Sequence, residues 1–389
     1  MEEVVQEVIE TVNESKLAFC KFISANDAGK TGGHQAGFYM PKTTIPLMFD
    51  SPGIKGENKD RFITIRWHKD FSTDSRFTYY GKGTRDEYRL TRFGRGFPFL
   101  SDDNVGDLFV LAHIGDDYYE GFVLSNDEDI ENFLTAFNIS PTETNDLIDK
   151  VGELAESNIS TCFRNYIKSL QQDFPPTLDM ALNARKCYNS VNRITEKLVR
   201  RRSDELIIAW IEAEYELFKE LENTRYGHII KTPFQTVEEL VQVANTILNR
   251  RKSRAGKSLE HHLAEIFVAH QFEFETQVRT EGNKKPDFLF PGQDSYHDKN
   301  FDEKKLILLA AKTTCKDRWR QILNEADRIE TKHLFTLQQG ISSNQLTEMQ
   351  RYNVQLVVPK KYKKAFPEKF QDNILSLADF IQYINKVQK

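Results

Sequence analysis

The chain has 389 residues, with 53 lysines and arginines against 58 aspartates and glutamates and a net charge of −5. This length is sufficient for two domains of ordinary size. The charge balance does not by itself indicate a nucleic-acid-binding protein, and it excludes none, because binding depends on where basic side chains gather. The four cysteines form no CxxC pair, so neither a zinc site nor a disulfide framework is expected.

The N-terminal stretch is acidic and lacks the basic and then apolar layout of a signal peptide. No apolar run approaches the roughly 20 residues that a membrane-spanning helix requires. We therefore expect a soluble protein of a reducing cytoplasm, without a membrane partner.

The first third of the chain is rich in short β-like runs, at residues 62–68, 75–80 and 88–93. A longer run over residues 107–124 has the pattern of a hairpin that turns at Gly115-Asp116-Asp117. Short strands with turn signals at regular spacing predict a small β-barrel. From about Asp127 the pattern becomes helical and polar.

The last part of the chain alternates between helical and strand patterns. Helical stretches at 191–221, 237–249 and 257–271 come first. They are followed by a strand at 306–312, a helix at 316–329, a strand at 333–337, a helix at 344–352, a strand at 354–358 and a helix near 376–387. This alternation predicts an α/β domain around a central mixed sheet. We expect a multidomain protein with a β-barrel domain at residues 1–145, a connecting helical segment at 146–180 and the α/β domain at 181–389.

An aspartate, a lysine and a glutamate occur in the α/β part in the order that a magnesium-dependent nuclease needs. Asp287 follows a proline at the start of an apolar run, and Lys312 ends the apolar run that is predicted to be a buried strand. Glu325 lies thirteen residues further on, in the predicted helix. Two carboxylates can hold Mg²⁺, while a lysine stabilises the attacking hydroxide and the charge that develops on the phosphate.

The second acid of such sites usually stands two residues before the lysine, where this chain has Ala310. Glu325 is the natural replacement, and Glu260 in the helical stretch from residue 257 is a further metal-proximal candidate. The alternative is that these are ordinary surface charges. Lys312 argues against it, because a lysine that closes an apolar strand is costly unless it is paired or part of a site.

Three stretches of the chain, at residues 250–260, 280–291 and 312–327, closely resemble the EcoRII-type restriction endonucleases. This resemblance implies a type II enzyme of the PD-(D/E)XK superfamily that uses Mg²⁺ to cut double-stranded DNA at a CC-containing pentanucleotide. It makes Asp287, Glu325 and Glu260 the metal-binding acids, and it adds Tyr296 as a catalytic candidate.

The triplet Lys316-Asp317-Arg318 follows the predicted catalytic strand. Arginine and lysine donate to guanine, and aspartate accepts from cytosine, so the triplet is suited to reading C·G pairs. A solvated helix N-terminus with an aspartate on the helix dipole is the alternative. The resemblance favours base reading, because the family reads its CC/GG half-site with a basic, acidic, basic triplet at this place.

Two stretches of the first domain, at residues 17–41 and 84–96, resemble the effector DNA-binding pseudobarrel of the same family. Gly29, Gly32 and Gly33 do not form a phosphate-binding loop, because the upstream glycine of a P-loop is missing. The resemblance implies DNA contacts from His34 and Tyr39 on one arm and from Lys82, Arg85, Glu87, Tyr88 and Arg89 on the other. The family has a basic residue where this chain has Tyr88, and the chain has one extra residue around Lys82-Gly83. An outward-facing amphipathic edge strand is the alternative.

The sequence therefore predicts a restriction endonuclease that cleaves at a CCWGG-like site, stimulated by a second copy of the site through the N-terminal domain. Its functional companion would be a DNA methyltransferase. Because a palindromic or pseudopalindromic site needs two active centres related by a two-fold axis, we expect a homodimer. The alternative is a non-cleaving DNA-binding regulator with a decayed nuclease domain. This alternative is disfavoured because Asp287, Lys312 and Glu325 are all intact.

Overall fold

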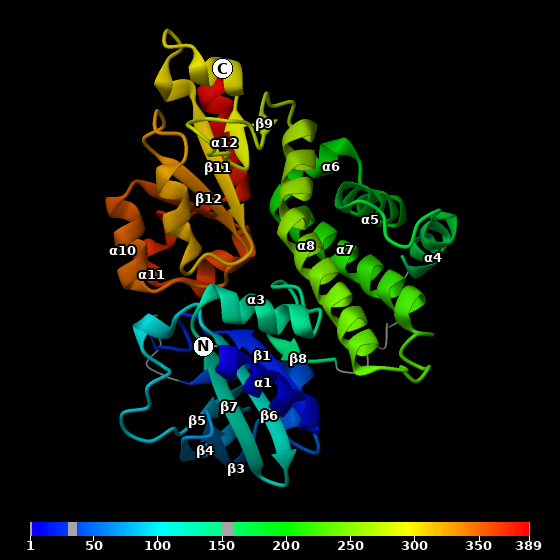
Figure 1. Cartoon of the computed structure of the whole chain (residues 1–389). Coiled ribbons are helices and arrows are strands. Elements are labelled where there is room, and N and C mark those ends of the chain that lie inside the picture. Colours follow the sequence, from blue (N-terminus) through cyan, green and yellow to red (C-terminus); the bar gives the residue numbers. More distant parts are fainter. Residues whose placement is uncertain (1, 30–36, 150–158, 389) are drawn as a thin grey trace. The chain divides into compact units, whose positions relative to one another are not determined.

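A computed structural model describes residues 2–29, 37–149 and 159–388 (Figure 1). The chain divides into two compact units. The first consists of Met1–Lys150, Gln338–Met349 and Tyr362–Asn373, and the second of Val151–Leu337, Gln350–Lys361 and Ile374–Lys389. In the described part of the chain, no helix combines the length and the apolar character of a membrane span.

The first unit is built on an eight-stranded curled sheet with the order β2-β5-β4-β3-β7-β6-β1-β8. Only the β3–β7 pair is parallel, and the other pairs are antiparallel. The strands are β1 (Leu17–Phe22), β2 (Phe38–Met40), β3 (Asn58–Trp67), β4 (Phe71–Tyr80), β5 (Glu87–Thr91), β6 (Leu108–Gly115), β7 (Tyr118–Leu124) and β8 (Asp146–Leu147). The hairpin expected at residues 107–124 is confirmed as β6 and β7.

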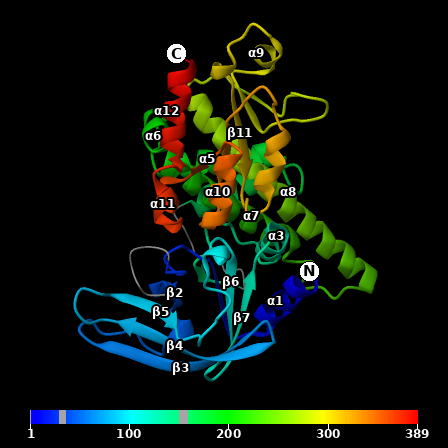
Figure 2. The same ribbon diagram turned by 90° about the vertical axis from the view of Figure 1, so that its left-hand side faces the viewer.

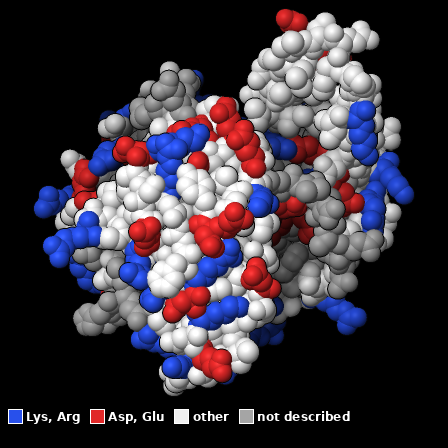
Figure 3. Space-filling view, turned by 90° about the horizontal axis from the view of Figure 1, so that it is seen from below, with Lys and Arg blue, Asp and Glu red and all other residues white. Residues whose placement is uncertain are grey.

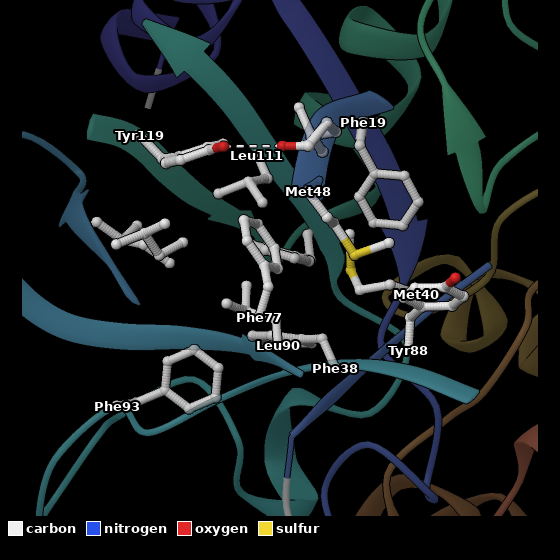
Figure 4. Close-up of a cluster of buried hydrophobic side chains, with 14 of the residues drawn as sticks. Phe19, Phe38, Met40, Met48, Phe77, Tyr88, Leu90, Phe93, Leu111 and Tyr119 are labelled. Carbon is white, nitrogen blue, oxygen red and sulfur yellow. Dashed lines mark hydrogen bonds between the residues drawn. The ribbon is translucent and has the colours of Figure 1, made fainter. Parts of the chain in front are cut away.

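The side chains on the two faces of this sheet form two apolar clusters. One face packs around aromatic residues such as Phe38, Phe77 and Trp67, and the hydroxyl of Tyr119 donates to the Leu47 carbonyl at 2.8 Å (Figure 4). The other face is covered by α1 (Glu2–Glu14) and α3 (Asp127–Ala136). Short helical turns at η1 (Lys42–Thr44), α2 (Ile45–Met48) and η2 (Asp102–Asn104) connect the strands.

Two segments from the last fifth of the chain belong to the first unit. They contain most of α10 (Ser343–Arg351), the end of η5 (Lys360–Ala365) and α11 (Glu368–Gln371). The backbone N–H and hydroxyl of Ser343 donate to the Asp102 carboxylate, both at 3.0 Å. Gly106 has φ +95°, and a Cβ on it would lie 2.4 Å from the Gly340 carbonyl oxygen. Only glycine therefore allows this close approach of the two backbones.

The second unit begins with five helices. Within the expected connecting segment 146–180, residues 146–147 belong to β8 of the first unit, and the residues from 160 onward contribute to the first two of these helices. These helices are α4 (Ser160–Ser169), α5 (Thr177–Val191), α6 (Glu196–Arg201), α7 (Ser203–Tyr226) and α8 (Val237–Ala269). Helices α4 and α5 pack against α7 around one buried apolar cluster. The two helices expected at 237–249 and 257–271 are one continuous helix, because a single glycine, Gly256, costs a helix only about 1 kcal/mol.

The sheet of the second unit has six strands in the order β14-β13-β12-β11-β10-β9. Figure 2 labels one of them, β11. Strands β11 to β14 are parallel, and β9 and β10 are antiparallel to their neighbours, so the predicted mixed sheet is confirmed. The remaining elements are β9 (Glu275–Thr276), β10 (Phe288–Phe290), α9 (Gln293–His297), η3 (Glu303–Lys305), β11 (Ile307–Lys312), η4 (Arg318–Asn324), β12 (Lys332–Thr336), β13 (Val354–Val358), β14 (Leu375–Ser376) and α12 (Leu377–Gln388).

The cysteines correct one expectation from the sequence. Cys162 on α4 and Cys187 on α5 form a disulfide with a Cα–Cα distance of 5.7 Å, whereas Cys20 and Cys315 are buried and take no part in it. The sequence pattern does not predict this pair, because the two cysteines stand 25 residues apart and come together only when α4 packs against α5.

Candidate active site

Asp287 is held at the point where β9, β10 and β11 lie side by side. The antiparallel register pairs Phe288 with Leu309, which places Asp287 next to the end of β11. One carboxylate oxygen, Oδ2, accepts from the Ala311 backbone N–H at 2.8 Å and from the Lys312 Nζ at 3.1 Å. Asp287 is 7% exposed, so this ion pair is largely shielded from water. The structure thus brings together two of the residues predicted from the sequence.

Gln277 is a member of the site that sequence reasoning missed. It follows β9, and the β9–β10 register places it opposite Asp287. Its amide Nε2 donates to Asp287 Oδ1 at 2.9 Å and to Glu260 Oε2 at 3.2 Å. A neutral amide between two acids gives no signal in the sequence, because its role depends on the strand register.

Glu260, from the buried second half of α8, is a second acid close to Asp287. Lys257, one helical turn before it, donates to both carboxylate oxygens at 3.0 Å. Burial and then the negative charge of Asp287 raise the pKa of Glu260 above its ordinary value. The structure therefore places this candidate within the electrostatic reach of Asp287.

Glu325 lies close enough to Asp287 and Lys312 for their charges to act on it. The helix expected at 316–329 is wrong: η4 is a short 3-10 helix that ends at Asn324, and Glu325 follows it in an extended conformation. Burial first, and then the charge of Asp287, raise the pKa of Glu325 to about 7, against smaller lowering effects of Lys312 and Lys332. Its buried Oε2 has no hydrogen-bond partner among the described residues.

Tyr296 lies in a different network. Its hydroxyl donates to Glu281 Oε1 and accepts from the Arg328 backbone N–H at 3.2 Å. Glu281 also accepts from the Asp327 backbone N–H at 3.1 Å. Burial and the bond to Glu281 raise the pKa of Tyr296, so the phenol keeps its proton. These contacts hold the loop just after Glu325, and the expected catalytic role of Tyr296 stays a prediction.

The triplet Lys316-Asp317-Arg318 follows β11, and its last residue, Arg318, begins η4. Lys316 is 7% exposed, Asp317 is exposed and precedes η4, and Arg318 is half-buried at its first position. The buried Trp319 anchors the turn from within. The triplet and Lys312 are therefore carried by one short segment that leaves the sheet at its carboxyl end.

The arrangement of the acidic side chains decides whether the site could hold a metal ion. In the described ranges, no three histidine, cysteine, aspartate or glutamate side chains converge closely enough to form a metal site. A catalytic Mg²⁺ commonly takes only one or two carboxylates and keeps several waters. Asp287 and Glu325 fit this requirement, because the Glu325 carboxylate has an unpaired buried oxygen and lies under the influence of the Asp287 charge.

The predicted DNA-contacting residues of the first unit lie on two paired strands and a loop. Tyr39 on β2 is directly opposite Arg89 on β5. Lys82 and Arg85 are exposed in the β4–β5 loop, and the Arg85 guanidinium lies 5.5 Å from the Tyr80 ring centre. His34 lies outside the described residues. On the face shown in Figure 3, basic and acidic side chains are intermingled.

Tyr88 departs from the expectation. Strand side chains alternate between faces, so Tyr88 points inward with Leu90 while Glu87 and Arg89 share the other face. Tyr88 lies in the buried cluster of Figure 4 and is 2% exposed. Its hydroxyl accepts from the Gly53 N–H at 2.8 Å. It is a core residue and not part of the DNA-binding surface that we propose. Arg89 is also mostly buried, with a bond from Nη1 to the Gly37 carbonyl at 3.3 Å.

A mixed sheet that carries an acid–lysine pair where two neighbouring interior strands, β10 and β11, meet, beside two further acids, defines the class of restriction-endonuclease-like nucleases. Family models described as "Restriction endonuclease EcoRII, N-terminal" and "EcoRII C terminal" match residues 12–152 and 218–381. The type II restriction enzyme EcoRII of Escherichia coli is 37% identical over 96% of this chain and 95% of its own length. The chain belongs to the EcoRII family of type II restriction endonucleases. It is a site-specific nuclease, and this membership implies the use of a divalent metal.

Other relatives cover smaller parts. The type II restriction enzyme SsoII of Shigella sonnei is 27% identical over 34% of this chain and 45% of its own length. Among solved structures, metal-depleted Ecl18kI in complex with uncleaved, modified DNA has a TM-score of 0.48 and 18% identity, and covers 59% of this chain and 84% of that chain.

We predict that Gln277→Ala lowers the cleavage rate and the metal affinity about 10- to 100-fold, the range for residues that orient metal ligands. Asp287 and Glu260 would lose their shared donor and repel each other. Single-turnover cleavage across a range of Mg²⁺ concentrations measures both effects. Gln242→Ala, in the exposed part of α8, is the matched control. A wild-type rate and metal dependence for Gln277→Ala would contradict this role.

Glu325→Gln is predicted to stabilise the metal-free protein at pH 8 by about 1–3 kcal/mol while removing activity. The raised pKa of Glu325 means that the fold favours the protonated acid. The free energy of unfolding is therefore lowered as pH rises from the ordinary pKa towards about 7, and the amide avoids this cost. Urea unfolding without divalent ions, at pH 8 and at pH 5, measures the gain, which should shrink at pH 5. Glu330→Gln, on an exposed residue, is the control, and an equal gain there would contradict the account.

Proposed function

We propose that this protein cleaves both strands of DNA with Mg²⁺ at a short CC…GG-type site resembling CCWGG. The observation that carries the proposal is the contact of Asp287 with Lys312, next to an acid, Glu325, whose pKa is raised to about 7. A cation bound here would relieve the repulsion between the Asp287 and Glu325 carboxylates. The positive charge of Lys312 would attract the phosphate of the substrate.

The roles of the side chains follow from their positions. Asp287 and Glu325 would hold the metal ion, with Glu260 near them. Bound Mg²⁺ supplies Lewis acidity and lowers the pKa of a coordinated water. Lys312, fixed by Asp287 at 3.1 Å, stabilises the attacking oxygen and the extra negative charge on the phosphate as the bond to the leaving oxygen breaks.

Sequence reading is assigned to two places. Lys316, Asp317 and Arg318 would contact the C·G pairs beside the scissile bond, since they share one segment with Lys312. In the first unit, Tyr39, Lys82, Arg85 and Glu87 would bind a second DNA site, together with His34 and the accessible part of Arg89. Such a second reader couples cleavage to a second copy of the site.

The symmetry of the substrate requires a homodimer, with one active centre for each strand. A DNA methyltransferase of the same specificity would protect the host DNA, and the cytoplasm would be the place of action. The rival function, a DNA-binding regulator without cleavage, is not favoured, because Asp287, Lys312 and Glu325 are all intact and the charge of Asp287 acts on Glu325.

Plasmid incubated with the protein and Mg²⁺ should give discrete fragments, and EDTA should prevent them. Asp287→Ala and Lys312→Ala should reduce cleavage by at least about 100-fold, because each removes charge at the scissile phosphate. Binding in a gel-shift assay should change little. Sequencing of the fragment ends identifies the site. A gel shift without cleavage by the wild-type protein would support the regulator instead.

Arg318→Ala should weaken binding to the cleaved site by about 1–3 kcal/mol and binding to random DNA far less. The reason is the loss of a base contact rather than of a phosphate contact. Fluorescence anisotropy with both DNAs measures the difference. Arg320→Ala, an exposed arginine two residues away, is the control. An equal loss on both DNAs would make Arg318 a phosphate contact.

The full-length protein should cleave a two-site plasmid several-fold faster than a one-site plasmid. Arg85→Ala should remove most of this advantage, because it weakens the effector contact while leaving the catalytic unit intact. Initial rates on the two plasmids measure it, and Arg95→Ala, which is exposed outside the proposed contact set, is the control. Equal wild-type rates on both plasmids would rule out stimulation by a second site.

A further inference from the structure

The first half of α8 carries an apolar stripe that is largely exposed in the part of the chain that the structure describes. The exposed fractions are 71% for Val237, 47% for Leu240, 49% for Val241 and 40% for Leu248, and Ala244 between them is also exposed. Their spacing of three and four residues places them on one side of the helix. A contiguous apolar stripe in water is typical of a surface that binds another protein.

The helical segment that carries the stripe is held by contacts on either side of it. At the N-terminus of α8, the Thr236 hydroxyl accepts from the Glu239 backbone N–H at 3.1 Å and caps the helix. One turn beyond the stripe, Arg251 forms an ion pair with Glu222 of α7 at 2.6 Å. From Leu259 onward, the helix is buried against the rest of the second unit. The exposed half of α8, seen in Figures 1 and 2, is therefore an extension of a firmly anchored helix.

The charges beside the stripe indicate which partner fits it. Glu238 and Lys252 are two heptads apart, so they lie along the same flank of the stripe, one at each end. When two such helices pack antiparallel, each flank faces the same flank of the other helix in reverse order. Glu238 then meets the partner subunit's Lys252, and the contact occurs twice. The surface is complementary to itself under a two-fold rotation.

We propose that this stripe is the contact with a second copy of the chain, in which the two α8 helices cross antiparallel near Ala244 and Asn245. The inference rests on the homodimer of the proposed function and names its surface. The pairing buries the stripe of both copies and places Glu238 beside Lys252 at both ends. Parallel packing would bring Glu238 of both copies to the same end, where their like charges repel each other.

Disulfide trapping tests this geometry. The Glu238→Cys protein mixed with the Lys252→Cys protein should form, on mild oxidation, a linked species of twice the 45.3 kDa chain mass, and neither protein should form it alone. Ala244→Cys, near the two-fold axis, should link to itself. Thr246→Cys, exposed on the side of α8 opposite the stripe, is the matched control that should stay unlinked. The native cysteines do not interfere, because Cys20 and Cys315 are buried and the other two form a disulfide.

A second experiment measures how much the stripe contributes to the strength of dimerisation. Leu240→Glu should weaken dimerisation at least about 10-fold in analytical ultracentrifugation, because it would bury a carboxylate without a partner in an apolar contact. Its melting temperature as a monomer should not fall, since the residue is exposed. Linking of Glu238→Cys to itself, or no linking in the mixed and Ala244→Cys samples, overturns the proposal. If plasmid cleavage of both strands persists in that case, the nuclease function stands and the dimer uses another surface.

Discussion

The contact between Asp287 and the end of β11 is the constraint on which the site depends. The carboxylate is nearly buried, and a buried charge is costly unless it is paired and hydrogen-bonded. The Ala311 N–H, the Lys312 ammonium and the Gln277 amide together satisfy both of its oxygens. These donors come from two strands on either side of β10, so the sheet register that satisfies Asp287 also positions the lysine.

The ionised forms of the neighbouring acids, Glu260 and Glu325, are destabilised at this site. Burial and the charge of Asp287 raise the pKa of both Glu260 and Glu325, so their ionised forms are disfavoured in the folded protein. A divalent cation would reverse this effect by accepting the carboxylates as ligands. On the proposed function, Asp287 is satisfied by its own donors, while Oε2 of Glu325, which has no hydrogen-bond partner among the described residues, would be available to the cation.

The sequence predicted the elements whose signals are local. The hairpin at residues 107–124 turns where Gly115 and two aspartates end an apolar run, and the strand ending at Lys312 is an apolar run closed by a charge. Features that depend on distant partners were not predictable. Gln277 joins the site through strand register, and the disulfide forms through helix packing. Tyr88 was assigned to the DNA face by family resemblance, but the alternation along β5 turns it into the core.

The most direct test of the account is the binding of Mn²⁺, a spectroscopic substitute for Mg²⁺, measured by electron paramagnetic resonance on the wild-type protein with DNA present. The account predicts that Asp287→Asn and Glu325→Gln each weaken Mn²⁺ binding at least about 10-fold. Glu330→Gln, on an exposed residue of the same unit, should leave it unchanged. Unaltered Mn²⁺ binding in both Asp287→Asn and Glu325→Gln would contradict the assignment of these acids and of the catalytic centre built on them.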